Sequence, residues 1–556
     1  MKLNIKNKLK EYWPYATVIL AIVLPWFFNS GYLFFTDNVW GPNIRLDWTS
    51  AWFIFNLVLK ALSFIFSISL LEKIFISGVL ALILLGGRIF VKTILHYYSK
   101  SESSSRGLVF VLSLFALFNP FVYDRALYGQ FGLLTAYGCM FFVLAYLLQV
   151  VRTLDLKYLY QAAIFTALTL MFAVHFIFLL APFYIVFLIA LLLKYREIKE
   201  PGQIKKLLLA LLFSTAIVLI INANWLIALA TQVSPLTNFV EQGISNQDLV
   251  AFQTIGKTPL ETFSNVLLMS GFWGKEQFRY LDLTAVAGWQ NNFLFLLPLI
   301  LYGVYLSCRR QSSQAKFFSF GLIITFSIAV MLSVGIKAPV TREFSLFLYN
   351  HLPFYKGLRE PQKWVAIIIP IYLFYLSLGA GRLQSFKFIA SNRVVSAIVL
   401  AALISVSSLS LLWGFNRQVK PTLYPADWYQ VDAYIRSQDQ CQHTTLFLPW
   451  HLYMSFNWIG NIVASPAYAF FSCPTITGTN MEFNGIYDNS QNPQGQQVEA
   501  WLGSNGTQAQ ILRNLSVRYV IIAKEVDWQS YDWIQKLSYL HLIKTTSTLL
   551  VYEIKP

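Results

Sequence analysis

Two oppositely charged residues stand side by side in a short polar segment between two long apolar runs. The segment, NPFVYDRALYGQFG, covers residues 119–132 and contains Asp124 and Arg125. Charged groups are costly next to apolar runs that could enter a membrane, so each requires a partner or a role. If a short helix follows Pro120, Asp124 and Tyr128 share one face, and Arg125 points about a quarter turn away. The pair predicts either a binding site or a salt-linked turn that holds two helices together.

A second polar segment, TDNVWGPNIRLDW at residues 36–48, directly follows the first apolar run. Its Asp37 lies close to the end of that run. Burial there would raise the pKa of a carboxylate and suit the group to accept a proton. We therefore predict a catalytic role for Asp37. The alternative is that Asp37 caps the following turn, a position where aspartate is common.

A third polar segment, GLREPQKW at residues 357–364, carries Arg359, Glu360 and Lys363 at the start of another apolar run. Two cations so close together suit a phosphate or pyrophosphate, which arginine can bind through two parallel hydrogen bonds. The alternative is that both side chains reach toward lipid headgroups. The positive-inside rule keeps this side of the membrane poor in Lys and Arg, which favours a specific anionic ligand.

Other polar residues carry weaker signals. The long segment at residues 226–291 holds Arg279 and Asp282, which we expect mostly on solvated faces and at caps. Its Trp273 fits a belt of aromatic residues at the membrane interface. His175 stands alone in apolar surroundings, where a packing residue is commoner than a ligand; a binding role is the alternative.

Composition fixes the broad class of the chain. It has 556 residues, of which 56% are apolar and only 12% charged, with a mean hydropathy of +0.54. These values predict a polytopic α-helical membrane protein. The net charge of +16 comes from Lys and Arg in short loops between apolar runs, as the positive-inside rule expects, so nucleic-acid binding is not predicted.

Runs of spanning length predict about 11 transmembrane helices with the N-terminus in the cytoplasm. The first run is read as a retained helix rather than a signal peptide. Residues 159–193 must cross twice, turning near His175 and Pro182. Residues 51–71 are read as an amphipathic helix on the outer surface, with a twelfth span as the alternative. The eleven runs are approximately 14–35, 73–95, 107–121, 131–151, 158–174, 176–194, 207–225, 291–308, 317–336, 363–381 and 394–414.

The chain changes character after residue 415. Residues 416–556 carry a soluble helix pattern, DWYQVDAYIRSQ, and three β-rich pieces, TTLFLPW, RYVIIAK and STLLVYEI. We predict two domains, a transmembrane module at 1–415 and an extracytoplasmic α/β domain at 416–556. Cys441 and Cys473 both fall in the second domain, where an oxidising compartment would allow a disulfide. No closely spaced ligand cluster predicts a structural zinc site.

The architecture and two motifs resemble the GT-C superfamily of glycosyltransferases. NPFVYDRALYGQFGLL is similar to the segment ending in R-x-x-x-G-Q-aromatic-G in the membrane module of α-(1→3)-arabinofuranosyltransferase-like proteins, and GLREPQKW to their R-E/D-P-x-K loop. The resemblance implies transfer of a sugar from a polyprenyl-phosphate donor to a glycan or glycolipid acceptor at the outer face of the cell membrane. The chain lacks the very large carbohydrate-binding region of those enzymes and has no clean DxD pair, so the sugar, the acceptor and a divalent metal stay open.

The resemblance also implies roles for individual residues. The catalytic aspartate of the first external loop corresponds to Asp37, with Asp47 as second choice, and Asp124 with Arg125 would line the donor or acceptor pocket. Apart from the resemblance, Asp124 is a further candidate for the base. The resemblance and the charge arguments above together give the predicted substrate-binding residues Asn119, Tyr123, Arg125, Gln130, His175, Arg359, Glu360 and Lys363.

Two functions of other classes remain open at this stage. A transporter or flippase for lipid-linked saccharides would need ionisable side chains deep within the spans, whereas here they crowd the ends. A non-catalytic protein that assembles envelope glycans would not need Asp37. Nucleotide sugars are disfavoured as donors, because the sequence has no GxGxxG or Walker-type loop to hold their phosphates.

Overall fold

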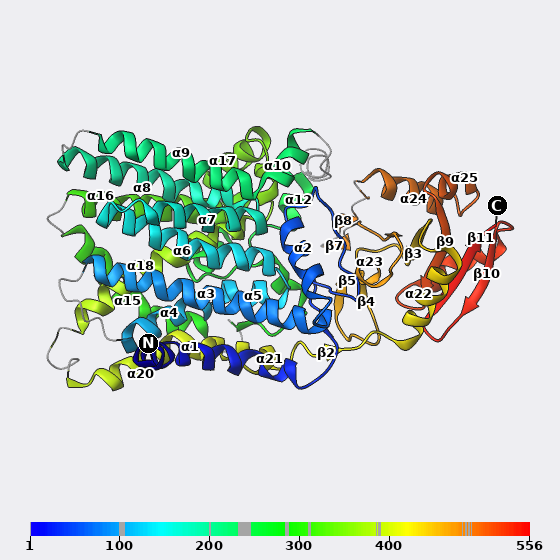
Figure 1. The fold of residues 1–556 in the computed structure, drawn as a ribbon, viewed down its shortest axis with the longest axis horizontal. Coiled ribbons are helices and arrows are strands. Elements are labelled where there is room, and N and C mark those ends of the chain that lie inside the picture. Colours follow the sequence, from blue (N-terminus) through cyan, green and yellow to red (C-terminus); the bar gives the residue numbers. More distant parts are fainter. Residues whose placement is uncertain are drawn as a thin grey trace.

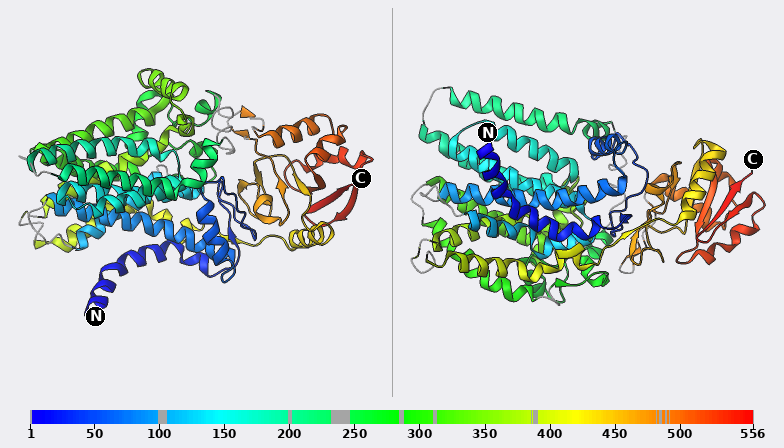
Figure 2. Two further views of the ribbon diagram at one scale, coloured as in Figure 1. Left: turned by 45° about the horizontal axis from the view of Figure 1, so that its top comes forward. Right: turned by 60° about the horizontal axis from the view of Figure 1, so that its bottom comes forward.

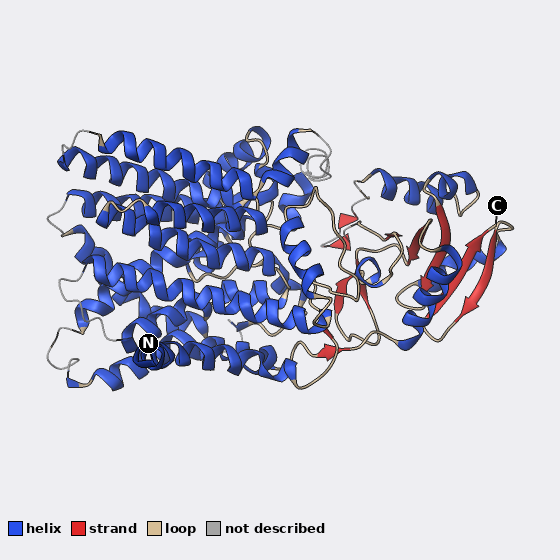
Figure 3. Ribbon diagram, viewed as in Figure 1, coloured by secondary structure: helices blue, strands red, loops and turns tan. Residues whose placement is uncertain are grey.

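The computed structural model shows a bundle of long helices with a mixed β-sheet beyond one end (Figure 1, Figure 3). Two further views place the sheet beyond the same end of the bundle (Figure 2). The chain is thus built from a helical part followed by a sheet part, in the order that the sequence predicts. The structure describes residues 2–98, 106–198, 202–231, 246–283, 288–309, 313–384, 386, 391–480, 482–483, 486–487, 490 and 492–555.

Each of the eleven predicted runs is helical over most of its length, but the first, 14–35, extends past the end of its helix at Phe27 into the strand Tyr32–Leu33. Among the described residues, seven helices are long and apolar enough to cross a membrane, or up to nine if each of two bent pairs forms one span. The chain is therefore a polytopic helical membrane protein, while the count of eleven and the cytoplasmic N-terminus stay predictions. The seven helices of spanning length are α3 (Ile68–Tyr98), α6 (Phe131–Thr153), α8 (Phe176–Ile198), α9 (Gln203–Ile221), α15 (Trp289–Cys308), α16 (Ser313–Val334) and α18 (Val365–Leu383). Two further helices, α1 (Lys2–Phe27) and α7 (Lys157–Phe172), are not among these seven. The bent pairs are α4 (Arg106–Leu117) with α5 (Pro120–Leu127), and α20 (Arg393–Ser405) with a segment that includes α21 (Leu412–Asn416).

A bend of 50° separates α4 from α5. Asn119 makes this bend: its side-chain amide donates to the carbonyl oxygens of Phe115 and Ala116 at 3.0 and 3.1 Å, and its oxygen accepts from the Val122 N–H at 3.0 Å. Pro120 occupies the first helical position, where a missing N–H costs nothing. The predicted short helix after Pro120 is confirmed, and fully buried Asn119 ends one helix and begins the next.

The apolar stretch at residues 51–71 is divided between two helices. α2 (Phe53–Leu62) covers its middle, and α3 already begins at Ile68. Ten helical residues rise about 15 Å, half of a hydrocarbon core about 30 Å thick. The stretch is therefore no twelfth span. Exposed apolar side chains on and after α2, including Leu57 and Phe64, suit the predicted surface helix.

The predicted double crossing at residues 159–193 is formed by α7 and α8, which meet in a turn that contains His175. The predicted turn position of Pro182 is wrong, because this proline lies inside α8. Proline is tolerated within membrane helices when neighbouring groups satisfy the freed carbonyl.

The C-terminal part contains a five-stranded sheet of order β10-β11-β9-β3-β6. β3 (Thr444–Leu448) runs parallel to both β6 (Thr475–Ile476) and β9 (Val517–Ala523). β11 (Leu549–Ile554) is antiparallel to β9 and to β10 (Leu540–Thr545). The three β-rich segments seen in the sequence thus become β3, β9 and β11, and the predicted α/β character is observed.

Alternate residues of the central strands fill two apolar cores, one on each face of the sheet. Phe447 and Ile521 belong to the core under α22 (Ala426–Asp439). Leu448 and Ile522 belong to the core under α24 (Pro493–Gly503) and α25 (Ala509–Asn514). We call the sheet, these three helices and the segments that connect them the sheet layer.

The segment after α1 folds into the sheet layer. β1 (Tyr32–Leu33) pairs antiparallel with β2 (Pro421–Thr422), just before α22. The Phe34 ring packs edge-on against the rings of Tyr424 and Trp458, each at 5.2 Å between centroids. Residues from both sides of the predicted boundary at 415/416 therefore share one core, and the boundary itself stays a prediction.

A disulfide and two hydrogen bonds from Arg45 stabilise the region where the segment after α1 contacts the sheet layer. Cys441 and Cys473 form a disulfide, as predicted. Arg45 donates to the Cys473 carbonyl oxygen at 2.7 Å and to that of Phe471 at 2.9 Å. The segment that follows Asp37 is thus tied to the sheet layer through main-chain acceptors.

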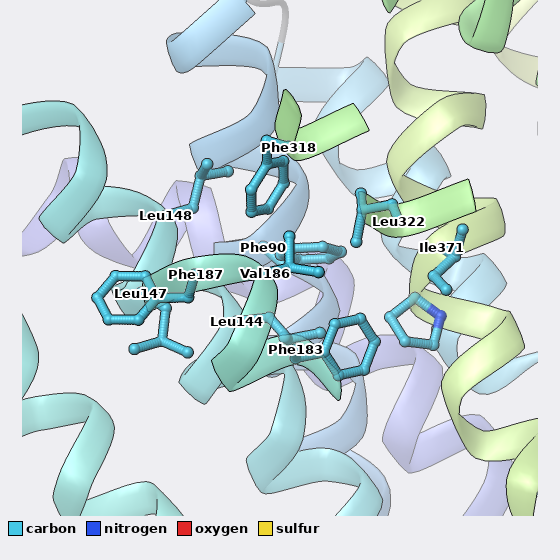
Figure 4. A pocket seen from close by; sticks show the side chains of 11 residues that line it. Phe90, Leu144, Leu147, Leu148, Phe183, Val186, Phe187, Phe318, Leu322 and Ile371 are labelled. Carbon is cyan, nitrogen blue, oxygen red and sulfur yellow. The ribbon is translucent and has the colours of Figure 1, made fainter. Parts of the chain in front are cut away.

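An apolar pocket lies within the helical bundle, away from the polar segments described above (Figure 4). Its walls come from α3, α6, α8, α16 and α18. Because no ionisable side chain lines it, the pocket offers no group for acid or base chemistry. The lining residues are Phe90, Leu144, Leu147, Leu148, Phe183, Val186, Phe187, Phe318, Leu322, Pro370 and Ile371.

Candidate active site

Three contacts fix the main chain around Asp37. The Leu33 N–H donates to the Glu72 carboxylate at the start of α3 at 2.9 Å. The Asp37 N–H donates to the Tyr128 carbonyl oxygen at 2.8 Å. Gly129 has φ of +81° and lies so close to the Asp37 segment that any side chain there would clash with it. The first polar segment is therefore held against the α5–α6 connection.

The Asp37 carboxylate accepts one hydrogen bond on each oxygen. The Tyr453 hydroxyl of the sheet layer donates to Oδ1 at 2.7 Å, and Gln130 Nε2 at the start of α6 donates to Oδ2 at 3.0 Å. Surrounding protein desolvates the group and raises the pKa of Asp37, while these two donors and nearby Arg279 act in the opposite direction. The side chain nevertheless stays exposed, so it can meet a hydroxyl and take its proton.

A network of charged groups begins at Gln130, whose side-chain oxygen accepts from buried Arg125. Arg125 also forms an ion pair with Glu360. Glu360 accepts a further hydrogen bond from the Trp273 indole at 3.0 Å and lies 3.1 Å from the Lys363 ammonium. Burial raises the pKa of Glu360, but Lys363 and Arg125 more than offset this and hold it well below its usual range. The polar segments at residues 119–132 and 357–364 thus meet beside Asp37.

The cations predicted to receive a phosphate already have carboxylate partners. Arg359 forms an ion pair with Asp248 at 2.9 Å, and its guanidinium lies 4.7 Å from the Phe252 ring centroid. Lys363 is paired with Glu360. Binding an anion at either residue would have to compete with a partner that is largely shielded from water.

His175 lies next to this network. Its Cβ lies near Gly357, whose carbonyl oxygen accepts from Lys363 at 3.3 Å. Burial and then the nearby Lys363 charge keep the pKa of His175 well below its usual range, so the imidazole is neutral. Its buried Nε2 atom has no hydrogen-bond partner among the described residues.

Asp124 faces away from Asp37. It lines a small cavity with Lys275 and Asp282, which pair with each other at 2.8 Å. Asp124 is buried, and within the described chain its Oδ2 has no hydrogen-bond partner. Because Asp124 and Arg125 point to different sides of α5, only Arg125 belongs to the network beside Asp37.

Two other predicted residues serve local contacts. Asp47 accepts from the Thr49 N–H at 2.9 Å and from its hydroxyl at 2.7 Å, which caps an exposed turn. Tyr123 donates to the Leu281 carbonyl oxygen and accepts from Gln418, both at 3.0 Å. The structure therefore brings neither Asp47 nor Tyr123 to the Asp37 carboxylate.

Arg279 was expected on a solvated face, yet it lies beside Asp37. Its guanidinium is 6.0 Å from the Tyr128 ring centroid and 5.7 Å from that of Tyr453. In the described part of the chain it has no ion pair and no hydrogen bond. Like Arg359, Arg279 is a cation on the predicted outer side, which the positive-inside rule keeps poor in Lys and Arg, so the sequence does carry a signal for it. Tyr453 carries no comparable signal, because nothing local links the sheet layer to the first polar segment.

No group of three or more His, Cys, Asp or Glu side chains that could hold a metal ion occurs among the described residues. The groups around Asp37 are a carboxylate, an amide, a phenol and a guanidinium. Such a set can accept a proton and balance negative charge on an anion.

Comparisons with known proteins show similarity of fold to solved structures. No protein-family model and no curated protein matches the chain. A cryo-EM structure of the arabinofuranosyltransferase AftD from Mycobacteria superimposes with a TM-score of 0.57 at 14% sequence identity, and covers 98% of this chain. The chain has a GT-C fold. A mutant of AftD matches that fold with a TM-score of 0.55 at 13% identity, again over 98% of this chain. The chain spans about two fifths of the length of AftD, since the matches cover 40% and 41% of it.

Proposed function

We propose that this protein is an integral-membrane glycosyltransferase that moves a sugar from a polyprenyl-phosphate donor to a hydroxyl of an envelope glycan or glycolipid at the outer face. One observation carries the proposal. The exposed Asp37 carboxylate is held by Tyr453 and Gln130 beside Arg279, at the junction of the helical bundle and the sheet layer. The fold shared with AftD, itself an arabinofuranosyltransferase, supports the same class of reaction.

The proposed transfer begins with removal of the acceptor proton. Asp37 takes the proton of the acceptor hydroxyl, and the acceptor oxygen forms a bond to the anomeric carbon of the sugar. The bond from that carbon to the phosphate oxygen breaks and leaves its electron pair on the departing polyprenyl phosphate. A base with a raised pKa suits the first step, and a nearby cation stabilises the charge that develops in the last.

Arg279 is the proposed contact for the phosphate. Arg125, Arg359 and Lys363 each hold a carboxylate, whereas Arg279 meets only aromatic rings within the described residues. Its guanidinium can therefore bind a phosphate without giving up an ion pair. Arg125 and Lys363 share one carboxylate, so their cluster keeps a net positive charge that acts on the phosphate without direct contact.

An apolar groove supports a lipid donor. It lies between α16, α13 (Pro259–Leu267) and α17 (Pro339–His351). Gly335, next to the end of the groove, packs on the ring of Pro361, the residue after Glu360. A prenyl chain in this groove would bring its phosphate toward the charged network. The groove is lined by Pro259, Phe263, Phe326, Ser327, Val330, Met331, Val334, Ala338 and Thr341.

Replacement of the proposed base tests the function. The full chain, purified in detergent, is given crude radiolabelled polyprenyl-phosphate sugars and an envelope glycolipid extract. Asp37→Asn keeps the shape of the side chain but cannot accept the proton, so we expect transfer to fall by about a thousandfold or more. Asp47→Asn, which changes a carboxylate in the same segment, should retain transfer. Equal transfer by Asp37→Asn and the unmodified protein would overturn the proposal.

A further inference from the structure

The sheet layer supplies one side chain to the candidate site. Tyr453 opens β4 (Tyr453–Ser455), which pairs with β5 (Ile462–Ala464) in a short hairpin. The Ala464 N–H donates to the Thr36 carbonyl oxygen at 2.8 Å, so this hairpin lies along the segment that carries Asp37. The Tyr453 hydroxyl then reaches Oδ1 of Asp37 at 2.7 Å.

His451, two residues before Tyr453, lies between the carboxylates of Glu482 and Asp527, and we call these three residues the charged clamp. His451 Nδ1 is 2.7 Å from a Glu482 carboxylate oxygen, and His451 Nε2 is 3.1 Å from one of Asp527. His451 follows β3, Glu482 comes after β6 and lies in β7 (Glu482–Phe483), and Asp527 follows β9. Because β3, β6 and β9 are parallel, the connections that leave their carboxyl ends meet at one edge of the sheet. The clamp therefore ties three connections together at that edge.

We propose that His451 is a positioning residue for the candidate base. Held between Glu482 and Asp527, it fixes the connection from β3 to β4 that presents the Tyr453 hydroxyl to Asp37. This inference rests on the proposed function, because it assigns His451 a part in the same transfer.

Only the imidazolium form of His451 can complete the clamp. Neutral imidazole has one N–H and can donate to one carboxylate, whereas the charged ring donates to both. Glu482 and Asp527 are the titratable groups that face the ring; nearby Glu499 accepts from the Trp450 indole instead. Burial lowers the pKa of His451, but the Asp527 and Glu482 carboxylates more than offset this and raise it above its usual value.

Deprotonation of His451 and deprotonation of Asp37 have opposite effects on transfer. The charged clamp is complete below the raised pKa of His451 and is lost as the pH rises through it. Asp37 must be ionised to act as a base, so transfer is lost as the pH falls through its raised pKa. We therefore expect a bell-shaped pH profile of kcat/KM whose alkaline side depends on His451.

Replacement of His451 has a matched control in the same domain. His443 precedes β3 and pairs with Asp439 at 2.6 Å, so it is a carboxylate-bound histidine near the opposite end of the same strand. In the transfer assay described above, His451→Gln should lower kcat/KM about tenfold and remove the alkaline fall in the profile. His443→Gln should leave the profile unchanged. A clear alkaline limb in His451→Gln, or the same loss in His443→Gln, would overturn the proposal.

A double-variant cycle separates positioning from a general loss of stability. Tyr453→Phe keeps the ring beside Arg279 and removes only the hydroxyl that reaches Asp37. If His451 acts through that hydroxyl, adding His451→Gln to Tyr453→Phe should cost less than a twofold further loss of kcat/KM. Independent, multiplied losses would contradict the inference. Thermal unfolding of each variant shows whether the fold has survived.

The outcomes also distinguish this inference from the proposed function. If Asp37→Asn retains full transfer, the proposed function fails. If Asp37→Asn abolishes transfer but His451→Gln matches the unmodified protein at every pH, only the role of His451 is wrong.

Discussion

At the residue scale, the cations of the site differ in whether they already have a carboxylate partner. Arg125 and Lys363 share the Glu360 carboxylate, and Arg359 holds Asp248. Buried partners of this kind are expensive to separate, because each charge left behind would lack both water and a counter-ion. Arg279 differs, since its guanidinium contacts only aromatic rings among the described residues. The cation that can receive an incoming anion at least cost is therefore the one beside Asp37.

Replacement of Arg279 should impair donor use. Arg279→Gln removes the proposed charge next to the leaving phosphate, and we expect kcat/KM for the polyprenyl-phosphate donor to fall about a hundredfold. Arg279→Lys keeps the charge and should recover part of the loss. Arg359→Gln is the comparison variant; it breaks the pair with Asp248 and should lower the thermal unfolding temperature more than donor use. The reverse ranking of Arg279→Gln and Arg359→Gln in steady-state kinetics would move the phosphate contact to Arg359.

Part of this cluster is predictable from the sequence. Asp37, Arg125 and Glu360 are predicted from charge placed next to apolar runs and Gln130 as a substrate-binding residue of the same segment as Arg125, and the structure brings all four together. Their pairing could not be predicted, because Arg125 and Glu360 lie in segments far apart in the chain. The same limit separated Asp124 from the cluster, since only the three-dimensional course of α5 decides which side chain faces Asp37.

At the element scale, long helices and β-rich strands were predictable, and short pairings were not. Apolar runs mark the helices because a membrane span needs about 20 apolar residues. β1 and β2 have only two residues each, and their pairing joins distant parts of the chain. No hydrophobic period can mark a strand of that length. The sharing of one core by the segment after α1 and the sheet layer was therefore found only in the structure.

At the element scale, removal of the disulfide should lower the stability of the protein by a measurable amount. It links Cys441, just after α22, to Cys473, just before β6, and closes a loop across a separation of 32 residues. Loss of such a cross-link gives the unfolded chain more freedom, which lowers the free energy of unfolding by about 4 kcal/mol. The double variant Cys441→Ser with Cys473→Ser should unfold at a lower temperature than the unmodified chain in detergent. Cys308→Ser, which changes an exposed free thiol at the end of α15, should not. Equal unfolding temperatures for both variants would show that the bond adds no stability.

At the scale of the whole molecule, the candidate site exists only where the two parts meet. The helical bundle provides Gln130 and the charged network, and the segment after α1 provides Asp37. The sheet layer provides Tyr453. Composition predicted both parts but not their juxtaposition, which depends on contacts between distant segments. A reaction that joins a membrane-bound donor to an acceptor outside the membrane requires a site at such a junction.

This arrangement predicts a dependence on the length of the donor lipid. Ser327 is an exposed residue in the wall of the groove between α13, α16 and α17, so Ser327→Trp should fill the groove without disturbing the core. Loss of contact with two methylene groups of a prenyl chain costs about 1.6 kcal/mol, which raises KM about tenfold for a long-chain donor. A donor with a chain too short to reach the groove should lose little, and Ser327→Ala should behave like the unmodified protein with both donors. Steady-state kinetics with long and short polyprenyl-phosphate sugars measures the difference. An equal rise in KM for both donors would place the lipid elsewhere on the bundle.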